Sequence, residues 1–315
     1  MAQMTPSTAR VIDPILSTVA QGYQNAALIG SSLFPVVTVE QRGGKIVTFG
    51  KEDFMQYSGL ARAPGGDTQR IQFSYGSTSY ALEQFAIEGQ VPFELMEDAQ
   101  AVPGIDLGRL AVQKVQSIIA LRLEIAQAGI ATTAGSYAAA NKTTLSGTAQ
   151  WSDQTTGASH PVSAIETAKD AIRAATGKRA NVIVMGAAVM AKLRTHPDVI
   201  DRIKYTGRDV ATPELLASLF GVQQVLTGDA ITATDAGVFS DVWGKFVIVA
   251  FTEIAGIAQM GLPSYGYTYR LRGNPTVEMA YQDRGSKSWI YPVTDELSPV
   301  MAAPSAGYLI SAAVA

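Results

Sequence analysis

The fold of this chain is decided by residues 43–94, which read GGKIVTFGKEDFMQYSGLARAPGGDTQRIQFSYGSTSYALEQFAIEGQVPFE. The segment opens with a short strand-like run at residues 45–49. It returns through residues 70–75 and 80–87, where polar and apolar side chains alternate as in a β-strand. Roughly twenty irregular residues lie between the two arms, and so long a connection without its own core is rare in a compact domain unless it has a function. The segment therefore predicts a long, functional hairpin.

The predicted hairpin is too long to stand alone. An arm of roughly 15 residues reaches about 50 Å at about 3.3 Å per residue. A compact chain of this length should have a radius of gyration of only about 20 Å. The hairpin must therefore fold back over its own domain or lie on a neighbouring molecule, and the composition of the chain favours a neighbour.

The 315-residue chain carries unusually little charge. Hydrophobic residues make up 47% of it and charged residues 16%, against about 25% charged residues in a typical domain. Because the cores of protein interfaces are depleted in charge, we expect part of the surface to lie against other protein. The net charge of −3 argues against binding nucleic acid by neutralising phosphates. The absence of cysteine excludes disulfides, thiolate metal sites and cysteine nucleophiles.

Nothing in the sequence predicts a membrane protein. Every apolar run is interrupted before about 18 residues, which is the length needed to span a bilayer. Residues 1–10 are polar and lack the apolar block of a secretion signal. We expect a soluble intracellular protein with no membrane partner.

The strongest predicted helix spans residues 106–131. Pro103 and Gly104 precede it, and Asp106 is a suitable N-cap. Glu124, like the basic residues of this helix, is expected on its exposed face. The predicted buried stripe repeats at three- and four-residue steps and consists of Val112, Val115, Ile119, Leu123, Ala126 and Ile130.

The remaining elements change character along the chain. A short helix after Asp13 and a strand at residues 33–39 precede the hairpin, and a polar hairpin at residues 143–151 precedes a helix at 162–176. From residue 181, buried strands alternate with short helices, which predicts a mixed sheet covered on both faces. Strands are expected at residues 181–185, 222–226, 245–251, 265–271, 276–281, 287–291 and 308–314, and helices at 187–194, 198–204 and 213–220.

No group of residues predicts chemistry. His160 and His196 lack the spacing of metal ligands and are interpreted as structural. No phosphate-binding glycine loop or serine nucleophile elbow occurs. The acidic residues at 94–98 are interpreted as a solvated face, and the charges at 283–287 as a polar loop or an intersubunit salt bridge. We therefore expect no catalytic, cofactor-binding or metal-binding residues.

Taken in order, these elements resemble the major capsid proteins of tailed bacteriophages, whose Hong Kong ninety-seven fold is shared with encapsulin shells. The resemblance covers essentially the whole chain and includes the runs THPDVIDRIKY at residues 195–205 and LASLFGV at 216–222. It implies an α+β fold with an N-terminal arm at 1–42 and an extended loop at 43–90. It further implies a peripheral domain at 91–178 and 270–297, with the long helix as its spine, and a mixed α/β axial domain at 179–269 and 298–315.

The resemblance also implies a function. The chain would assemble with itself into hexamers and pentamers of an icosahedral head, in the host cytoplasm, and would become part of the virion. Its partners would be scaffolding, portal and decoration proteins and packaged double-stranded DNA, bound without sequence specificity. The residues expected at assembly contacts are Arg10 and Asp13 on the arm and Glu52, Phe54, Tyr57, Arg62, Asp67 and Arg70 on the loop.

Two other functions remain open at this point. An encapsulin-type compartment has the same architecture but packages enzymes, and a cargo groove would distinguish it. An α/β enzyme with its active site within residues 181–251 would instead have a polar pocket at a strand end.

Overall fold

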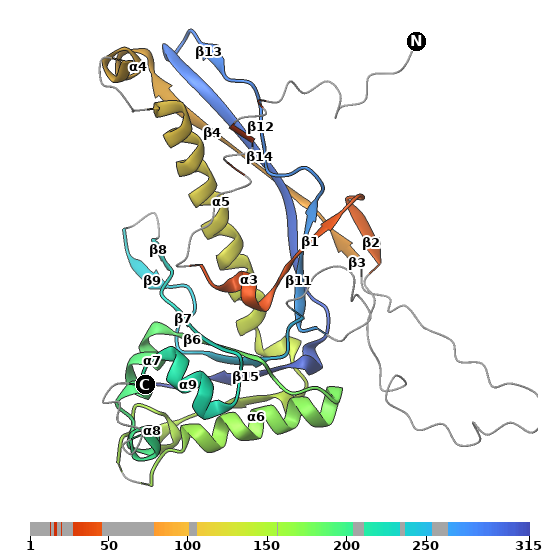
Figure 1. Ribbon diagram of the computed structural model, residues 1–315, viewed down its shortest axis with the longest axis vertical. Helices are drawn as coiled ribbons and strands as arrows, with labels where there is room; N and C mark the ends of the chain where they lie inside the picture. Colours follow the sequence, from red (N-terminus) through yellow and green to blue (C-terminus); the bar gives the residue numbers. More distant parts are fainter. Residues whose placement is uncertain are drawn as a thin grey trace, which may run out of the picture.

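The computed structural model describes residues 13, 16–17, 20, 28–45, 79–100, 106–155, 157–203, 211–233, 237–253 and 264–315. Within these ranges the chain forms an elongated unit, with a six-stranded sheet and one long helix, and a compact unit with a five-stranded sheet (Figure 1). Two additional two-stranded ladders, β2 with β3 and β8 with β9, lie at the sides of the molecule.

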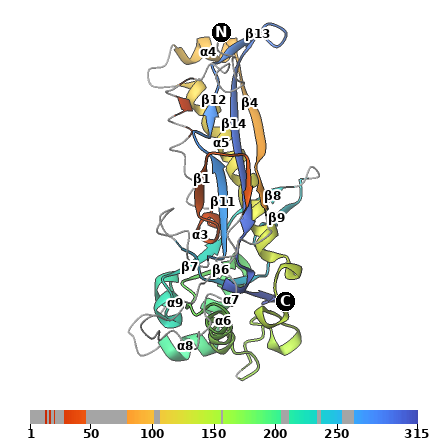
Figure 2. The same cartoon turned by 90° about the vertical axis from the view of Figure 1, so that its right-hand side faces the viewer.

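Strand β14 (Ser288–Met301) organises the elongated unit, because most of the sheet pairs with it. β4 (Glu83–Pro92) pairs with it in antiparallel fashion, from Glu83 opposite Leu297 to Pro92 opposite Ser288. β11 (Gly266–Leu271), β12 (Thr276–Val277) and β13 (Tyr281–Asp283) also pair with β14, and β1 (Val36–Val39) adds in parallel to β11. The result is a long, narrow sheet (Figure 2).

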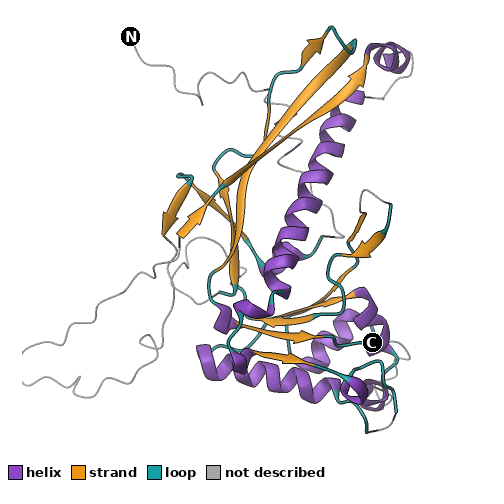
Figure 3. Cartoon of the chain, turned by 180° about the vertical axis from the view of Figure 1, so that it is seen from behind, coloured by secondary structure: helices purple, strands orange, loops and turns teal. Residues whose placement is uncertain are grey.

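Helix α5 (Leu107–Thr132) runs along this sheet, as Figure 3 shows from behind. The side chain of Asp106 accepts a 3.0 Å hydrogen bond from the backbone N–H of Arg109, so the predicted N-cap is confirmed. Val112, Val115 and Ile119 are buried against the sheet, in a cluster that also contains Val277 and Val293. At about 1.5 Å per residue the helix is nearly 40 Å long, which makes it the spine of the elongated unit.

The predicted buried stripe of α5 is correct in its first half and wrong in its second. In the second half, the predicted stripe residues Leu123, Ala126 and Ile130 are only half-buried, whereas Glu124, which was expected on the exposed face, is only 2% exposed. The reason is a change of neighbours along the helix: the sheet covers its first half, and polar groups from two other segments cover the second. Hydrophobic spacing alone does not reveal such a change.

The sheet of the compact unit has the order β5 (Lys142–Thr144), β15 (Gly307–Ser311), β10 (Val247–Ala250), β6 (Val182–Gly186) and β7 (Gln224–Gly228). Successive residues of β6 point to opposite sides. Ile183 and Met185 join the core beneath the short helices, and Val182 and Val184 join the core shared with α3 (Gly30–Leu33) and the end of α5. The prediction of a mixed sheet covered on both faces is therefore confirmed.

Four helices of the compact unit match the predicted ones closely. Gly177 and Gly221 end two of them in the left-handed conformation, with φ of 67° and 63°, where glycine avoids the strain that a Cβ atom causes. The four helices are α6 (Pro161–Thr176), α7 (Ala187–Arg194), α8 (Pro197–Ile203) and α9 (Pro213–Phe220).

The placement of α6 corrects the predicted grouping of residues 91–178. Ile165, Ala168 and Ile172 are fully buried in the core of the five-stranded sheet, together with residues of β6, β10 and β15. The apolar face of α6 thus packs on this sheet and not on the spine helix. The sequence showed that face but not the surface it covers.

Two local predictions are also wrong. Residues 143–151 do not form a hairpin: β5 pairs in parallel with β15, and Trp151 is fully buried. Residues 33–39 are not one strand, because α3 extends to Leu33 and β1 begins at Val36, after Pro35. Proline has no N–H to contribute to a ladder, which accounts for the later start of the strand.

The remaining elements are short. They are α4 (Phe93–Gln100), β2 (Gly43–Lys45), β3 (Ser79–Ala81), β8 (Ile231–Ala233) and β9 (Phe239–Asp241), with 3₁₀ turns at Ala134–Ser136, Ala139–Asn141, Gly147–Ala149 and Pro304–Ala306. Among the described helices, none is both long enough and apolar enough to cross a lipid bilayer.

Candidate functional site

The two ends of the extended segment meet the body of the molecule at one place, the loop base. Here β2 and β3 pair in antiparallel fashion, with Gly43 opposite Ala81 and Lys45 opposite Ser79. The backbone N–H of Leu82 donates to the carbonyl of Arg42 over 2.8 Å. The predicted hairpin is therefore confirmed at its base, and residues 46–78 lie outside the described residues.

A bidentate ion pair fixes the loop base to the central strand. The guanidinium of Arg42 donates from Nε and Nη2 to the two carboxylate oxygens of Glu296, over 2.6 and 3.0 Å. The Arg42 side chain is 70% exposed, whereas that of Glu296 is 5% exposed. Such a fork fixes direction as well as distance, so the pair orients the chain at the point where the loop begins.

Two further contacts at the loop base involve β11 or the residue that follows it. The rings of Tyr80 and Tyr269 stack at 4.4 Å between centroids, and burial raises the pKa of Tyr269 to about 12. Arg272 forms an exposed ion pair with Glu40. Both sides of the loop base are thus held by β11, β14 and the residues that follow β11.

Asp295 lies beside Glu296 in the chain but is on the other face of the strand. It is 1% exposed, and its carboxylate lies 3.1 Å from a guanidinium nitrogen of Arg270. Burial raises the pKa of Asp295, and the charge of Arg270 opposes that rise. Neither acid was predicted as a functional residue, although two adjacent acids inside an otherwise strand-like segment were a visible signal.

A third buried carboxylate joins the two units. Glu124 of α5 accepts hydrogen bonds from the backbone N–H groups of Ile29 and Gly30, at 3.1 and 2.8 Å, and from Nε1 of Trp243 at 2.7 Å. Burial raises its pKa, and these three donors work in the opposite direction. The carboxylate connects the spine helix to the start of α3 and to the segment before β10.

Of the predicted assembly residues, the structure describes only Asp13. Its carboxylate accepts from the backbone N–H of Leu16 over 3.0 Å, as expected of a helix N-cap, and its own N–H donates to the carbonyl of Val277 over 3.0 Å. Ser17 also bonds to the backbone of Val277. These contacts tie the arm to the edge of the sheet in its own chain. The other predicted residues, Arg10, Glu52, Phe54, Tyr57, Arg62, Asp67 and Arg70, lie outside the described residues.

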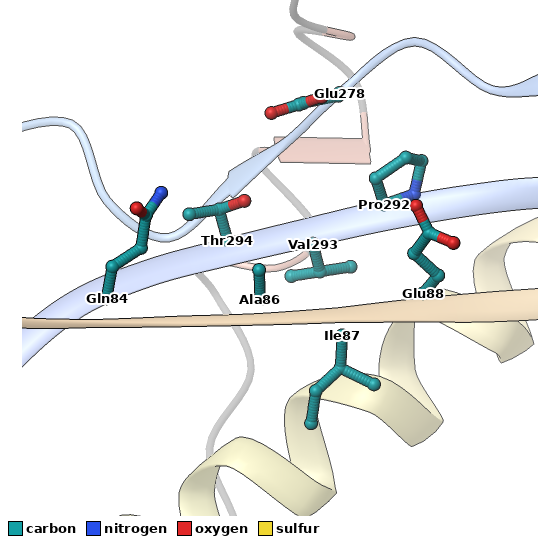
Figure 4. A pocket seen from close by; sticks show the side chains of 8 residues that line it. All are labelled: Gln84, Ala86, Ile87, Glu88, Glu278, Pro292, Val293 and Thr294. Atoms are coloured by element: carbon teal, nitrogen blue, oxygen red, sulfur yellow. The ribbon is translucent and has the colours of Figure 1, made fainter.

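A groove runs over the outer face of the elongated sheet, between β4, β14 and the residue after β12 (Figure 4). Its volume is about 580 Å³, and the hydroxyl of Tyr281 donates to Glu88 at its edge over 3.2 Å. Among the described residues that line it there is no histidine, lysine or serine. Its lining consists of Gln84, Ala86, Ile87, Glu88, Glu278, Pro292, Val293 and Thr294.

The histidines have the surroundings of structural residues. His196 is 2% exposed, its Nε2 lies 2.7 Å from the hydroxyl of Ser159, and its Nδ1 accepts from the backbone N–H of Asp198. His160 stands before α6 and is exposed. Among the described residues, no three acidic, histidine or cysteine side chains are grouped as metal ligands would be.

The fold is similar to that of solved shell proteins. At 14% identity and a TM-score of 0.58, the chain is similar to the capsid of an empty GTA particle, with 98% of this chain and 94% of that chain covered. At 11% identity and a TM-score of 0.55, it is similar to the SrpI encapsulin of Synechococcus elongatus PCC 7942, with 99% and 96% covered. These likenesses confirm the α+β shell fold.

Closer relatives identify the family. The chain is 38% identical over 309 residues to the major capsid protein of Burkholderia phage BcepMu, with 97% of each chain covered. It is 43% identical to a phage-related protein of Bordetella bronchiseptica RB50, whose crystal structure matches with a TM-score of 0.83 over 97% of this chain and 98% of that one. The family model described as phage major capsid protein E matches residues 132–225. The chain belongs to the phage major capsid proteins.

Proposed function

We propose that this chain is the shell subunit of an icosahedral phage head, and that it assembles into hexamers and pentamers around double-stranded DNA. The observation that carries the proposal is the 38% identity to a phage major capsid protein along almost the full length of both chains. A match of that extent includes the loop, the spine helix and both sheets, so it concerns the whole architecture.

The extended loop is the proposed contact between subunits. The Arg42–Glu296 fork and the Tyr80–Tyr269 stack anchor the entering and leaving strands at the loop base. An anchored base sets the direction in which a long segment leaves toward a neighbour. We assign the contacts to Glu52, Phe54, Tyr57, Arg62, Asp67 and Arg70 on the loop and, on the arm, to Arg10 and Asp13.

The remaining partners follow from the same proposal. Scaffolding, portal and decoration proteins would complete the head, which would form in the host cytoplasm and become the virion. A net charge of −3 suits an inner surface that encloses DNA without gripping it. The role of the chain is assembly, and the proposal includes no catalytic step and no cofactor. The units around the six-stranded and five-stranded sheets would be the peripheral and axial domains.

Particle size is the direct test. The purified chain, alone and co-expressed with phage head proteins, would be measured by light scattering and negative-stain electron microscopy. We expect shells tens of nanometres across, or rings the size of a capsomer that await a scaffold. Small uniform shells filled with a host enzyme would instead indicate an encapsulin. A species that is strictly monomeric under every condition would overturn the proposal and favour the alternative of an α/β enzyme.

A further inference from the structure

The two faces of the β8–β9 hairpin differ: three of the four side chains on one face are apolar and the fourth is Asp241, whereas the pair on the other face is Thr232 and Ser240. In its antiparallel register, Ile231 lies opposite Asp241 and Ala233 lies opposite Phe239. Because cross-strand partners and alternate residues share a face, these four side chains lie together. Thr232 and Ser240 form the central pair and point to the other face. The hairpin therefore has the pattern of a strand pair that is covered on one side.

The structure leaves that apolar face open. Phe239 is 70% exposed and Ile231 is 53% exposed, although a lone two-stranded hairpin is marginally stable in water. Large apolar side chains gathered on a projecting element are typical of contacts with another protein. The charged side chains of the hairpin are all acidic, since the sequence has no lysine or arginine between Arg208 and Lys245. Its partner should be apolar with basic groups nearby.

The position of the hairpin indicates which surface could cover it. The β8–β9 hairpin stands on one flank of α5, and β1, β2 and β3 lie on the opposite flank, at a similar level along the long axis of the molecule (Figures 1 and 2). In a closed ring of identical subunits, one flank of each copy meets the opposite flank of the next. In the proposed ring the long axis of each copy runs radially, so a level along that axis is a distance from the ring axis. Rotation keeps this distance, and elements at one level on the two flanks are then brought together.

The opposite flank has the required chemistry. Val36 of the edge strand β1 is 44% exposed. The side chains of Arg42 and Arg272 are 70% and 73% exposed, and each is paired with an acid of its own chain. A guanidinium has five N–H donors, so each keeps donors available for a second carboxylate.

We propose that the apolar face of the β8–β9 hairpin docks on the β1 flank of a second copy of this chain. Phe239 and Ile231 would cover Val36, and Asp241 would lie near the exposed guanidinium groups. This contact rests on the proposed assembly into rings, but it is separate from the contact made by the extended loop. It gives neighbouring subunits a second point of attachment, close to the five-stranded sheet.

The absence of cysteine makes a clean cross-linking test possible. The double variant Val36→Cys/Phe239→Cys has two thiols at exposed positions, so no core residue is altered. Assembled particles would be treated with a short bismaleimide and separated on a denaturing gel. We expect a ladder of covalent multimers, formed at least ten times faster than in the control Val36→Cys/Ser240→Cys, whose second thiol is on the polar face.

The outcomes separate this contact from the proposed function. Shells that form normally but give no faster ladder than the control would overturn the docking proposal and leave the shell function standing. A dimer formed equally well by Phe239→Cys alone would mean that hairpins meet each other, which also overturns it. If no assembly forms under any condition, the shell function fails and this contact fails with it.

A substitution without a cross-linker gives a second measurement. Phe239→Glu places a charge on the apolar face, and we expect the yield of shells to fall at least tenfold while the subunit melts at the temperature of the wild type. The matched control is Ser240→Glu, which adds the same charge to the polar face and should assemble normally. Equal yields from the two variants would contradict the proposal.

Discussion

Glu124 shows how one buried carboxylate can hold two parts of a subunit together. Its oxygens accept three N–H groups, two from the backbone before and at the start of α3 and one from Trp243. Gly30 has no space for a side chain, because a Cβ atom there would lie 2.1 Å from Oε1 of Gln127 and 2.7 Å from the Glu124 carboxylate. The glycine lets the backbone N–H approach the acid, so the hydrogen bond to Glu124 depends on the absence of a side chain at Gly30.

Replacing Glu124 should therefore be costly even when the shape is kept. In Glu124→Gln an amide NH₂ would face an N–H donor, and we expect the free energy of unfolding to fall by about 1–3 kcal/mol. Chemical denaturation of the dissociated subunit measures this loss. Arg122→Gln, an exposed change on the same helix, should stay within about 0.5 kcal/mol of the wild type. If Glu124→Gln leaves the free energy of unfolding unchanged, the carboxylate does not hold the junction.

His196 should make the compact unit sensitive to mild acid. Burial lowers the pKa of His196 below its ordinary value, an effect to which His160 adds and which Asp198 opposes. The folded state thus binds this proton less readily than the unfolded state does. The stability that neutral His196 contributes is fully present above the ordinary pKa of about 6.5, and it declines as the pH falls through that value.

Thermal unfolding at a series of pH values tests this expectation. We expect the melting temperature of the wild type to fall between about pH 6.5 and pH 5. His196→Gln should flatten that dependence, and His160→Gln should keep most of it, because burial lowers the pKa of His196 more than His160 does. Identical pH profiles for the wild type and His196→Gln would rule out the histidine as the cause.

At the scale of elements, two glycines stand where the spine helix packs on the long sheet. A Cβ atom at Gly89 of β4 would lie 3.1 Å from that of Ala111, and one at Gly108 would lie 2.7 Å from the hydroxyl of Tyr291. Both glycines are at the contact between α5 and the β4–β14 pair. Small residues at this contact determine how closely the helix approaches.

Gly89→Val should push the helix away from the sheet. We expect a loss of about 1–3 kcal/mol in the free energy of unfolding, because the added methyl groups overfill the contact. Ala86→Val adds volume to the same strand at an exposed position and should be nearly neutral. Urea titration of both variants makes the comparison, and equal stabilities would mean that the contact adapts without cost.

At the scale of the whole molecule, the extended loop is expected to matter for assembly rather than for folding. Its base is anchored in the body, while the apolar cores of the two units are formed by the sheets, α5 and the short helices. Deleting residues 59–66 should therefore leave a subunit with the melting temperature of the wild type that fails to form stable shells. Electron microscopy and thermal unfolding give the two readings. Normal shells from the deletion variant would contradict the proposal that the extended loop makes the contact between subunits.

Local patterns in the sequence were sufficient for most elements. The boundaries of α5, α6, α7 and α9 and the buried strand β6 follow from caps, proline and glycine positions and hydrophobic spacing, which are interactions within a few residues. Low charge and a long unsupported hairpin pointed to a subunit that works in contact with other copies. Both signals are visible in the chain without any partner.

Only the tertiary structure decided what each surface packs against. The pattern of α6 showed an apolar face but not the five-stranded sheet beneath it, and the pattern of α5 gave no sign that Glu124 would meet three donors from distant segments. The Arg42–Glu296 fork joins residues separated by 254 positions. Such contacts depend on how strands and helices are brought together in space, and periodicity along one chain contains no information about a partner so far away.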